Sequence, residues 1–435
     1  MFLPSLFDKI NDNIRYAVLR NYEKLPDSIG DSDLDILIHK DDYQSFIKCI
    51  HELNIEYDFD IVSVIEHPLC PHFCILGTNW GIQIDIFIGC IIHKNVVLYD
   101  WVFLSDYIVN YNQIKALNND FANIIAFIKE VLNNKTCKDK YFEQAHHSIG
   151  QFSEIEKNKI FGIFDDENRK NIISYIESEN FNKNDVKILA QRASSNLVSF
   201  CGKIKYKVGQ FAKLKRVFKQ TGYSIAFMGT DGSGKSTVIN KIKPVLNSAF
   251  HNNVYYRHLR PSALPSLAVL FGKKAKHEVP VVNDNPHGGK PSGFLGSLFR
   301  LNYYLLDYTI GYFIKIFPKK SVKSCVWIFD RYYYDYLIDP KRNCIKLPKW
   351  IVKFYSNFVP TPDIIICLGS DAKIIRNRKP ELPLFEVERQ VSDLKEFAKK
   401  EKKAIWIDSG CSEDETVHRT MSAICDMMKK RGFVI

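Results

Sequence analysis

The sequence lacks a secretion signal, a disulfide framework and a zinc motif. Residues 1–8 have neither a positively charged start nor a long apolar core, so no signal peptide is expected. The eleven cysteines are scattered and odd in number, which indicates reduced thiols. His67, Cys70, His72 and Cys74 stand close together, but no second cluster has zinc-site spacing, so we expect them on a strand edge. These absences favour a cytoplasmic protein.

Neither hydrophobicity nor charge is extreme. Of the 435 residues, 46% are hydrophobic and 25% are charged, which is typical of globular protein, and the length indicates two or three domains. The formal net charge of +11 is explained by anionic substrates as easily as by nucleic acid. We therefore expect a globular protein that handles anionic molecules, and no nucleic-acid partner.

One glycine-rich stretch has the spacing of a phosphate-binding loop. It follows an apolar run at 224–228 and precedes a helix-forming segment, which is the context that such a loop requires. Its residues are Gly229, Thr230, Asp231, Gly232, Ser233, Gly234, Lys235, Ser236 and Thr237. We predict that ATP or a close relative binds here together with Mg²⁺.

Each residue type in this loop has a physical reason. The glycines allow backbone angles that turn successive amide groups inward, around phosphate oxygens at the N-terminus of a helix. Lys235 would reach the β- and γ-phosphates, and the hydroxyl of Ser236 would hold magnesium. A glycine-rich turn without a ligand would not require the lysine and the hydroxyl at these two positions.

The chain from 221 to 435 alternates apolar strands with helices, which predicts a three-layer α/β domain with a parallel sheet. Strands are expected at 224–228, 253–261, 325–329, 363–368 and 404–408. Ligands of such sheets bind beyond the carboxyl ends of the strands. Charged residues follow several of these ends, namely Arg257, Arg260, Asp330, Arg331, Arg376, Arg378 and Lys379.

This part of the chain resembles the thymidylate-kinase-like branch of the nucleoside monophosphate kinases. The resemblance rests on the loop at 229–237, on Asp330-Arg331-Tyr332 after an apolar strand, on Pro362-Asp363 before another, and on the basic cluster at 376–379. It implies a kinase that uses ATP and Mg²⁺. It also implies that Asp330 orients magnesium or the acceptor and that Arg331 grips the anionic group of the acceptor. Arg376, Arg378 and Lys379 would belong to a mobile lid.

Three acids lie in apolar strands nearer the start of the chain. Asp33 and Asp35 fall two residues apart in a strand expected at 32–38, which places both carboxylates on one face. Asp85 lies in an apolar strand expected at 81–88. Because an unpaired buried charge is costly, a divalent metal bridging the three carboxylates would explain them.

The segment from Gly30 to Asp35, with Asp85 on a later strand, resembles the acidic triad of the nucleotidyltransferase superfamily. In that superfamily such acids hold magnesium and a nucleoside triphosphate. This chain has Arg20-Asn21 where the family has a Gly-Ser pair. Three interpretations stay open: an active nucleotidyltransferase, a fold retained for binding an anionic sugar or nucleotide, and an acidic turn without function.

The resemblances also suggest an acceptor for the kinase. Arg260-Pro261 lies where the thymidylate-kinase-like branch has an acceptor-binding arginine, and Arg257 stands close to it. The acceptor would be a nucleotide of the thymidylate kind or another anionic or sugar molecule, including a glycolipid. The combination of domains resembles thymidylate-kinase-like proteins associated with bacterial surface-polysaccharide biosynthesis.

The predicted organisation is an N-terminal α/β nucleotidyltransferase-like domain at 1–110, a helical connector at 111–220 and the phosphate-loop domain at 221–435. The connector ends in a basic segment at 203–219, which we expect to be a solvated linker helix, with binding to an anionic membrane or to nucleic acid as the alternative. Residues 281–293 form a polar loop suited to an acceptor. Residues 297–314 form an aromatic helix whose neighbouring charges make it a poor membrane span.

The leading interpretation is an ATP- and magnesium-dependent kinase joined to a domain that prepares or binds the acceptor. One alternative is a nucleotidyltransferase that uses Asp33, Asp35 and Asp85, with the phosphate-loop domain as a nucleotide-gated switch. Another is an assembly factor that binds nucleotide without transferring a group. We expect a cytoplasmic location, with peripheral membrane contact through 203–219 as the alternative, and the sequence specifies no oligomeric state.

Overall fold

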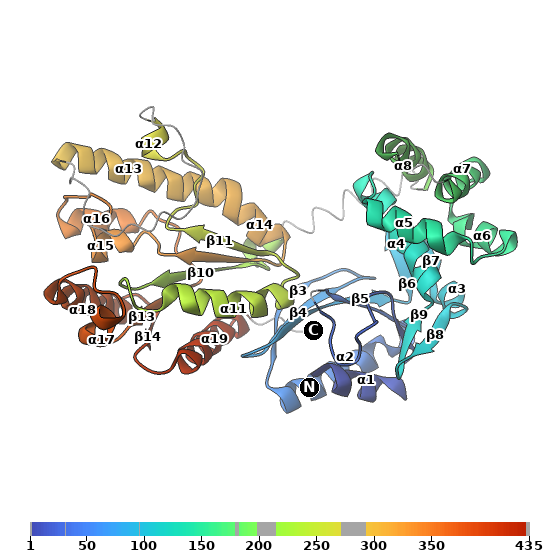
Figure 1. The fold of residues 1–435 in the computed structure, drawn as a ribbon, viewed down its shortest axis with the longest axis horizontal. Coiled ribbons are helices and arrows are strands. Elements are labelled where there is room, and N and C mark those ends of the chain that lie inside the picture. The colour runs from blue at the N-terminus through green and yellow to red at the C-terminus, as the bar shows by residue number, and fades with distance from the viewer. Residues whose placement is uncertain are drawn as a thin grey trace.

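The computed structural model describes residues 2–30, 32–94, 96–178, 182–197, 215–270 and 293–431. It has two halves, one built on a mixed sheet and the other on a wholly parallel sheet (Figure 1). The predicted α/β class is confirmed. Among these residues, no helix combines the length and the apolar character needed to cross a membrane.

The N-terminal sheet has the strand order β3-β4-β5-β2-β1-β9-β8. Its strands are β1 (Tyr16–Val18), β2 (Leu34–Ile38), β3 (Asp60–Ile65), β4 (His72–Leu76), β5 (Gly81–Ile88), β8 (Ile108–Tyr111) and β9 (Ile114–Leu117). β2 and β5 run parallel, with Asp35 opposite Asp85. Because side chains alternate along a strand, Ile36 and Asp35 face opposite sides of the sheet.

Helices cover both faces of this sheet. On one face, α1 (Phe2–Asn11) and α2 (Tyr43–Tyr57) pack on Ile36 and Ile84. On the other face, α4 (Asn119–Asn134) packs on Leu37 and Phe87. The remaining elements are η1 (Lys40–Asp42), β6 (Cys90–His93), β7 (Val96–Asp100), α3 (Trp101–Ser105), α5 (Asp139–Ile149), α6 (Glu154–Ile160), η2 (Phe161–Ile163), α7 (Asp166–Glu177) and α8 (Lys183–Leu197).

The C-terminal sheet has the order β11-β12-β10-β13-β14, and every pair is parallel. Its strands are β10 (Tyr223–Met228), β11 (Val254–His258), β12 (Val326–Asp330), β13 (Ile364–Gly369) and β14 (Ala404–Asp408). The three central strands are buried at every position, which explains why they read as continuous apolar runs. All five predicted strands of this domain are present.

Helices lie on both faces of the parallel sheet. One face carries α11 (Lys235–Ala249) and α19 (Glu413–Lys429), and the other carries α13 (Phe294–Gly311), α16 (Lys349–Ser356) and α18 (Leu384–Lys400). The shorter elements are α10 (Lys215–Phe218), α12 (Leu267–Leu270), η4 (Tyr312–Ile316), α14 (Phe317–Val322), α15 (Asp335–Ile338) and α17 (Ala372–Arg378). The arrangement has the three layers that the alternation of strands and helices predicts.

The N-terminal sheet extends beyond the boundary predicted at residue 110. β9 pairs in parallel with β1, through Ala116 and Val18, so the chain up to Leu117 belongs to this sheet. Such a pairing joins segments that are far apart in sequence, so the local hydrophobic periodicity cannot predict it. Most of the basic segment at 203–219 and of the loop at 281–293 lies outside the described residues.

The two halves share a hydrophobic core. α11 and α19 lie between the parallel sheet and strands β3 to β5 (Figure 1), where Val62 and Leu76 join the same apolar cluster as Ile242 and Leu246. At the edge of this cluster, Ser63 Oγ donates a hydrogen bond of 2.9 Å to the carbonyl oxygen of Thr221. The helix that follows the phosphate loop is therefore packed on both sheets.

We expect Gly81→Ala to lower the free energy of unfolding by about 1–3 kcal/mol, the usual cost of overpacking. A Cβ at this position would lie 2.7 Å from Ala249 Cβ and 2.8 Å from the carbonyl oxygen of Val245, so β5 or α11 would have to move. Gly150→Ala is the matched control, because nothing lies within 4 Å of that Cβ. Urea unfolding of both variants measures the difference, and equal stabilities would contradict the close packing of the two halves.

Candidate active site

The phosphate-loop sequence lies at the carboxyl end of β10, the central strand of the parallel sheet, and leads directly into α11. Gly232 and Gly234 have φ angles of +83° and +86°, in the left-handed region that favours glycine. A Cβ on Gly229 would overlap Ser233 Oγ and would lie 2.5 Å from the carbonyl oxygen of Leu368. The backbone therefore requires a glycine at each of these three positions.

Lys235 is buried under the loop, with 7% of its surface exposed. Its Nζ atom donates to the carbonyl oxygens of Gly229 (2.9 Å) and Thr230 (2.8 Å), and no carboxylate of the described residues forms an ion pair with it. Burial, followed by the positive charge of Arg331, lowers the pKa of Lys235 to about 8. A bound phosphate would supply a directly bonded anionic partner for this lysine.

Three buried oxygen atoms near the loop have no hydrogen-bond partner within the described part of the chain. They are Thr230 Oγ1, Ser233 Oγ and Asp330 Oδ1. Asp330 ends β12 in register with Phe227 of β10, which places it at the same edge of the sheet as the loop. Since buried polar atoms are almost always paired, these atoms indicate a polar ligand, and hydroxyl and carboxylate oxygens are ligands that Mg²⁺ prefers.

The second carboxylate oxygen of Asp330 is held in place by a neighbouring strand. Tyr256 on β11 donates a hydrogen bond of 3.0 Å from its hydroxyl to Asp330 Oδ2. The carboxylate is thereby oriented at one oxygen while the other remains without a partner among the described residues. This arrangement fits a group that holds a metal ion or an acceptor hydroxyl.

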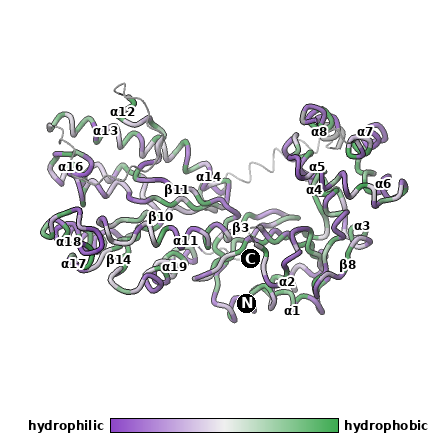
Figure 2. The backbone as a smooth tube through the Cα atoms, viewed as in Figure 1, coloured by the Kyte–Doolittle hydropathy of each residue, from purple (hydrophilic) through white to green (hydrophobic). Residues whose placement is uncertain are grey.

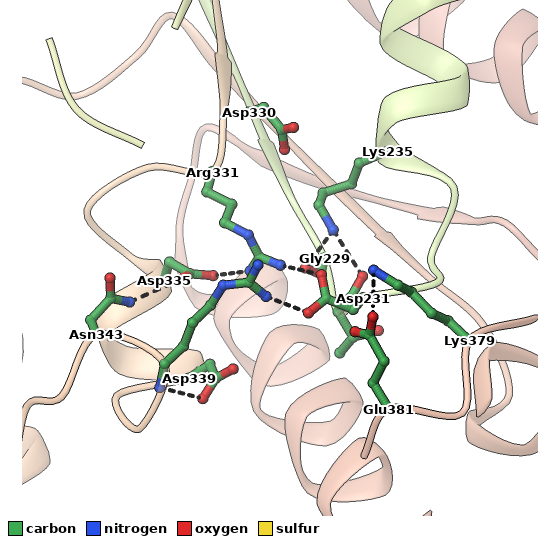
Figure 3. A network of polar contacts seen from close by, with 12 residues as sticks. Gly229, Asp231, Lys235, Asp330, Arg331, Asp335, Asp339, Asn343, Lys379 and Glu381 are labelled. Atoms are coloured by element: carbon green, nitrogen blue, oxygen red, sulfur yellow. Dashed lines mark hydrogen bonds and ion pairs between the residues drawn. The ribbon is translucent and has the colours of Figure 1, made fainter. Parts of the chain in front are cut away.

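Arg331 joins the phosphate loop to the segment that follows β12 (Figure 3). Its guanidinium nitrogens donate to Asp231 Oδ1 and to Asp335 Oδ1, both at 2.7 Å, and Arg342 donates to the other oxygen of Asp231. Burial opposes ionisation of Asp231, but the charges of Arg331, Lys235 and Arg342 hold its pKa well below the ordinary value. Two guanidinium groups are thus fixed at the edge of the loop.

Asp335 and Arg342 also belong to this site, and neither is among the site residues predicted from the sequence. Asp335 stands at the i+4 position from Arg331, a spacing at which side chains on a helical turn form ion pairs, and this signal was available. Arg342 gives no comparable signal, because its partner Asp231 is 111 positions away in the sequence.

The two arginines predicted to bind the acceptor lie at and just beyond the end of β11. Arg260 forms an ion pair of 3.1 Å with the fully buried Asp307 of α13, and its guanidinium lies 4.7 Å from the ring centroid of Tyr304. Arg257 lies 5.9 Å from the ring centroid of Trp327. Arg260 is therefore fixed in place, and the acceptor-binding role of both residues stays a prediction.

The predicted lid arginines lie on α17, which ends against the phosphate loop. A Cβ on Gly232 would lie 2.8 Å from the carbonyl oxygen of Ile375, so this helix closely approaches the loop. Arg376 donates to the carbonyl oxygen of Leu382 (3.2 Å) and Arg378 to that of Ser409 (2.9 Å). Both guanidinium groups bind the main chain of neighbouring segments here, and their lid role stays a prediction.

The three acids of the N-terminal sheet lie together. One carboxylate oxygen from each of Asp33, Asp35 and Asp85 is within 4.8 Å of the others, and all three residues are buried. This convergence follows from the register of β2 with β5. Three carboxylates at this separation are suited to one divalent cation, and metal binding there stays a prediction.

Cationic side chains already pair with these acids. Arg20 donates to Asp35 and lies 3.5 Å from Asp33, and His72 Nδ1 lies 2.7 Å from Asp85 Oδ1. Burial alone would lower the pKa of His72, but its hydrogen bond to Asp85 raises it to about 10. The three carboxylates are therefore only partly balanced by Arg20 and His72, and a metal ion would compete with these cations for the carboxylate oxygens.

A pocket of about 230 Å³ opens beside this acidic triad. Arg20 and Asp35 line one side of it, and Lys129, Asn133 and Tyr141 of α4 and α5 line another. Charged and amide groups around a partly apolar floor suit a small polar ligand. The pocket fits the expectation that this half binds an anionic sugar or nucleotide, which stays a prediction.

No protein-family model matches the chain, and no curated protein matches it. Among solved structures, a thymidylate kinase from Ehrlichia chaffeensis is similar over 47% of this chain and 98% of that one, with 17% sequence identity and a TM-score of 0.33. At this TM-score the likeness supports no conclusion about this chain, so the function has to be inferred from its own residues.

The lowered pKa of Lys235 predicts that phosphate binding depends on pH. A bound polyphosphate stabilises the ammonium form, so binding takes up a proton wherever the free lysine is neutral. Without a ligand, the pKa of Lys235 is about 8. At lower pH the lysine is charged before and after binding, so the affinity is constant. At higher pH the unliganded lysine is neutral, and the affinity falls as the pH rises. We expect the Kd of an unhydrolysable ATP analogue to rise about tenfold between about pH 7 and about pH 9.

Isothermal titration calorimetry in buffers of different ionisation enthalpy measures both the Kd and the proton uptake. Lys241→Ala is the control, because Lys241 lies on the same helix but pairs with Glu413 and Asp414 at the surface, and it should keep the pH dependence. A Kd that does not change over this range would contradict the role of Lys235.

Proposed function

We propose that the protein is a phosphate-loop kinase that transfers the γ-phosphate of ATP to an anionic or sugar acceptor. The observation that carries the proposal is the buried ammonium group of Lys235, whose hydrogen-bond partners among the described residues are the carbonyl oxygens of Gly229 and Thr230. Burying a cation that no carboxylate contacts directly is costly, and a polyphosphate at the loop would offset that cost.

The residues around the loop suit the needs of phosphoryl transfer. The amide groups of 229–235 would bind the phosphates, and Lys235 would neutralise charge on the transferred group. Arg331 is held next to the loop by its hydrogen bond of 2.7 Å to Asp231 Oδ1. From there it would stabilise the negative charge that spreads over the phosphate oxygens during transfer. Magnesium held by Ser236 and Asp330 would neutralise further phosphate charge when bound.

The residues expected to bind the acceptor favour an anionic molecule. Arg257 lies near the carboxyl end of β11, and Arg260, Arg331 and Arg342 follow the carboxyl ends of β11 and β12, where ligands of parallel sheets bind. Arginine binds phosphate and carboxylate groups through two parallel hydrogen bonds. A nucleoside monophosphate of the thymidylate kind fits this chemistry, and so does a phosphorylated sugar or glycolipid in surface-polysaccharide synthesis.

Nucleotidyl transfer at the acidic triad is the second candidate function. The convergence of Asp33, Asp35 and Asp85 within 4.8 Å and the adjoining pocket favour it. The pairing of these acids with Arg20 and His72 weighs against it, because these cations occupy the carboxylates. We therefore rank it below the kinase.

Label transfer tests the proposal. With Mg²⁺ and ATP labelled on the γ-phosphate, and with nucleoside monophosphates, sugars and lipid-linked glycans as acceptors, we expect label on one acceptor class. Lys235→Ala and Asp330→Asn should each lower the turnover by about a hundredfold to a thousandfold, since each removes charge stabilisation at the transferred group. Lys241→Ala should leave the rate unchanged.

The same assay with ATP labelled on the α-phosphate examines the second candidate. Asp33→Asn combined with Asp35→Asn should leave γ-phosphate transfer intact. Transfer of the α label that survives Lys235→Ala and disappears in the double aspartate variant, with no transfer of the γ label, would overturn the kinase proposal. Nucleotide binding without transfer of either label would instead favour an assembly factor.

A further inference from the structure

Four arginine side chains stand near the carboxyl ends of β11 and β12, and they differ in how much of each guanidinium group is free to bind a ligand. They are Arg257, Arg260, Arg331 and Arg342. An arginine binds a phosphate most strongly when two parallel N–H groups point at two of its oxygens. The arginine that binds an acceptor therefore has to keep two such groups open.

Arg331 and Arg260 are held by carboxylates of the protein. Arg331 donates to Asp231 and Asp335, both at 2.7 Å (Figure 3), and 4% of its side chain is exposed. Arg260 Nη1 lies 3.1 Å from Oδ2 of Asp307, which is fully buried. Because a buried ion pair is costly to break, neither guanidinium group is available to grip an acceptor.

Arg257 points away from the carboxyl end of the sheet. Its register partner on β12 is Phe329, but its guanidinium carbon lies 5.9 Å from the ring centroid of Trp327, two residues further from that end. Its Nη1 atom donates to the carbonyl oxygen of Tyr256 at 3.2 Å. The guanidinium group therefore lies back along the sheet, away from the edge where ligands of parallel sheets bind.

Arg342 keeps one edge of its guanidinium group open. Its Nη1 atom donates to Asp231 Oδ2, and its Nε and Nη2 atoms have no hydrogen-bond partner among the described residues. Of its side chain, 26% is exposed. The Nε and Nη2 atoms carry two parallel N–H groups, so Arg342 can bind two oxygens of one anionic group without releasing Asp231.

Two neighbouring elements fix Arg342 in this position. Asp231 belongs to the phosphate loop, so it holds Arg342 beside the phosphates that the loop would bind. The backbone amide of Arg342 donates to Asp339 Oδ1 at 3.3 Å. Hydrophobic residues recur along α13 (Figure 2), but its polar residue Ser297 accepts a hydrogen bond of 2.9 Å from the backbone amide of Lys346. The segment that carries Arg342 is therefore anchored both to the loop and to α13.

We propose that Arg342 binds a phosphate group of the acceptor, and that the acceptor is a phosphorylated molecule and not a neutral sugar. This inference rests on the proposed kinase function, and it assigns to Arg342 the contact that the sequence predicts for Arg331. The phosphates of ATP would have the loop amides and Lys235 as partners, which leaves the open edge of Arg342 for the second substrate. A nucleoside monophosphate and a sugar phosphate present the same group to this arginine, so the test includes both.

Acceptors offered in matched pairs test the proposal. With Mg²⁺ and ATP labelled on the γ-phosphate, the pairs are nucleoside monophosphates with their nucleosides and sugar phosphates with the free sugars. We expect the wild type to transfer label to a phosphorylated acceptor and not to its unphosphorylated counterpart, because only the phosphorylated molecule offers two oxygens to the open edge of Arg342.

Variants of Arg342 separate binding of the acceptor from binding of ATP. Arg342→Ala should raise the KM of the acceptor by about tenfold to a hundredfold, since it removes two charged hydrogen bonds, and should leave the KM of ATP close to that of the wild type. Arg342→Lys should restore the acceptor KM only in part, because an ammonium group cannot form the paired contact. The matched control is Lys341→Ala, the preceding residue, whose side chain is 63% exposed and lies 3.7 Å from Glu386.

The outcomes distinguish this inference from the kinase proposal. Transfer to an acceptor whose KM is unchanged in Arg342→Ala would overturn the inference and leave the kinase proposal intact, as would equal use of both members of a pair by the wild type. A fall in the kcat of Arg342→Ala that is the same with every acceptor and with water would assign the guanidinium group to the γ-phosphate of ATP instead. No transfer of the γ label by the wild type would contradict the kinase proposal and this inference with it.

Discussion

The packing of helix α11 against both sheets fixes how the two halves of the molecule are arranged. The helix begins at Lys235, directly after the phosphate loop, and ends at Ala249 against Gly81 of the N-terminal sheet. Its 15 residues make it about 22 Å long. His251, just beyond its end, lies 3.7 Å from Asp33 of the acidic triad. The helix therefore sets the separation of the two sites, with Lys235 at its start in one site and His251, two residues beyond its end, next to the other.

The two sites differ in how their buried charges are balanced. At the phosphate loop, the ammonium of Lys235 has carbonyl oxygens as partners, so negative charge from a ligand would improve its environment. At the acidic triad, Asp35 and Asp85 are paired with Arg20 and His72 inside the protein. A metal ion there would have to compete with a cation already in place, because a buried ion pair is costly to break. This contrast ranks phosphoryl transfer above nucleotidyl transfer.

Local sequence patterns predicted the elements that carry these sites. The strands at 81–88 and 404–408 have the predicted bounds, because an apolar run between turn residues defines the ends of a strand to within a few positions. The backbone of the phosphate loop could be predicted because glycine is the residue that usually occupies left-handed positions. The pairings of Arg342 with Asp231 and of Arg20 with Asp35 have no local signature. They arise only when distant segments pack together, as does the docking of α11 on the first sheet.

The most direct test of this account is a crystal structure of the protein with Mg²⁺ and an unhydrolysable ATP analogue. We expect the polyphosphate to lie within the loop 229–235, with the ammonium of Lys235 turned from the carbonyl oxygens of Gly229 and Thr230 to the phosphate oxygens. An analogue bound instead in the pocket beside Arg20, with no nucleotide at the loop, would contradict the account and assign the chemistry to the acidic triad.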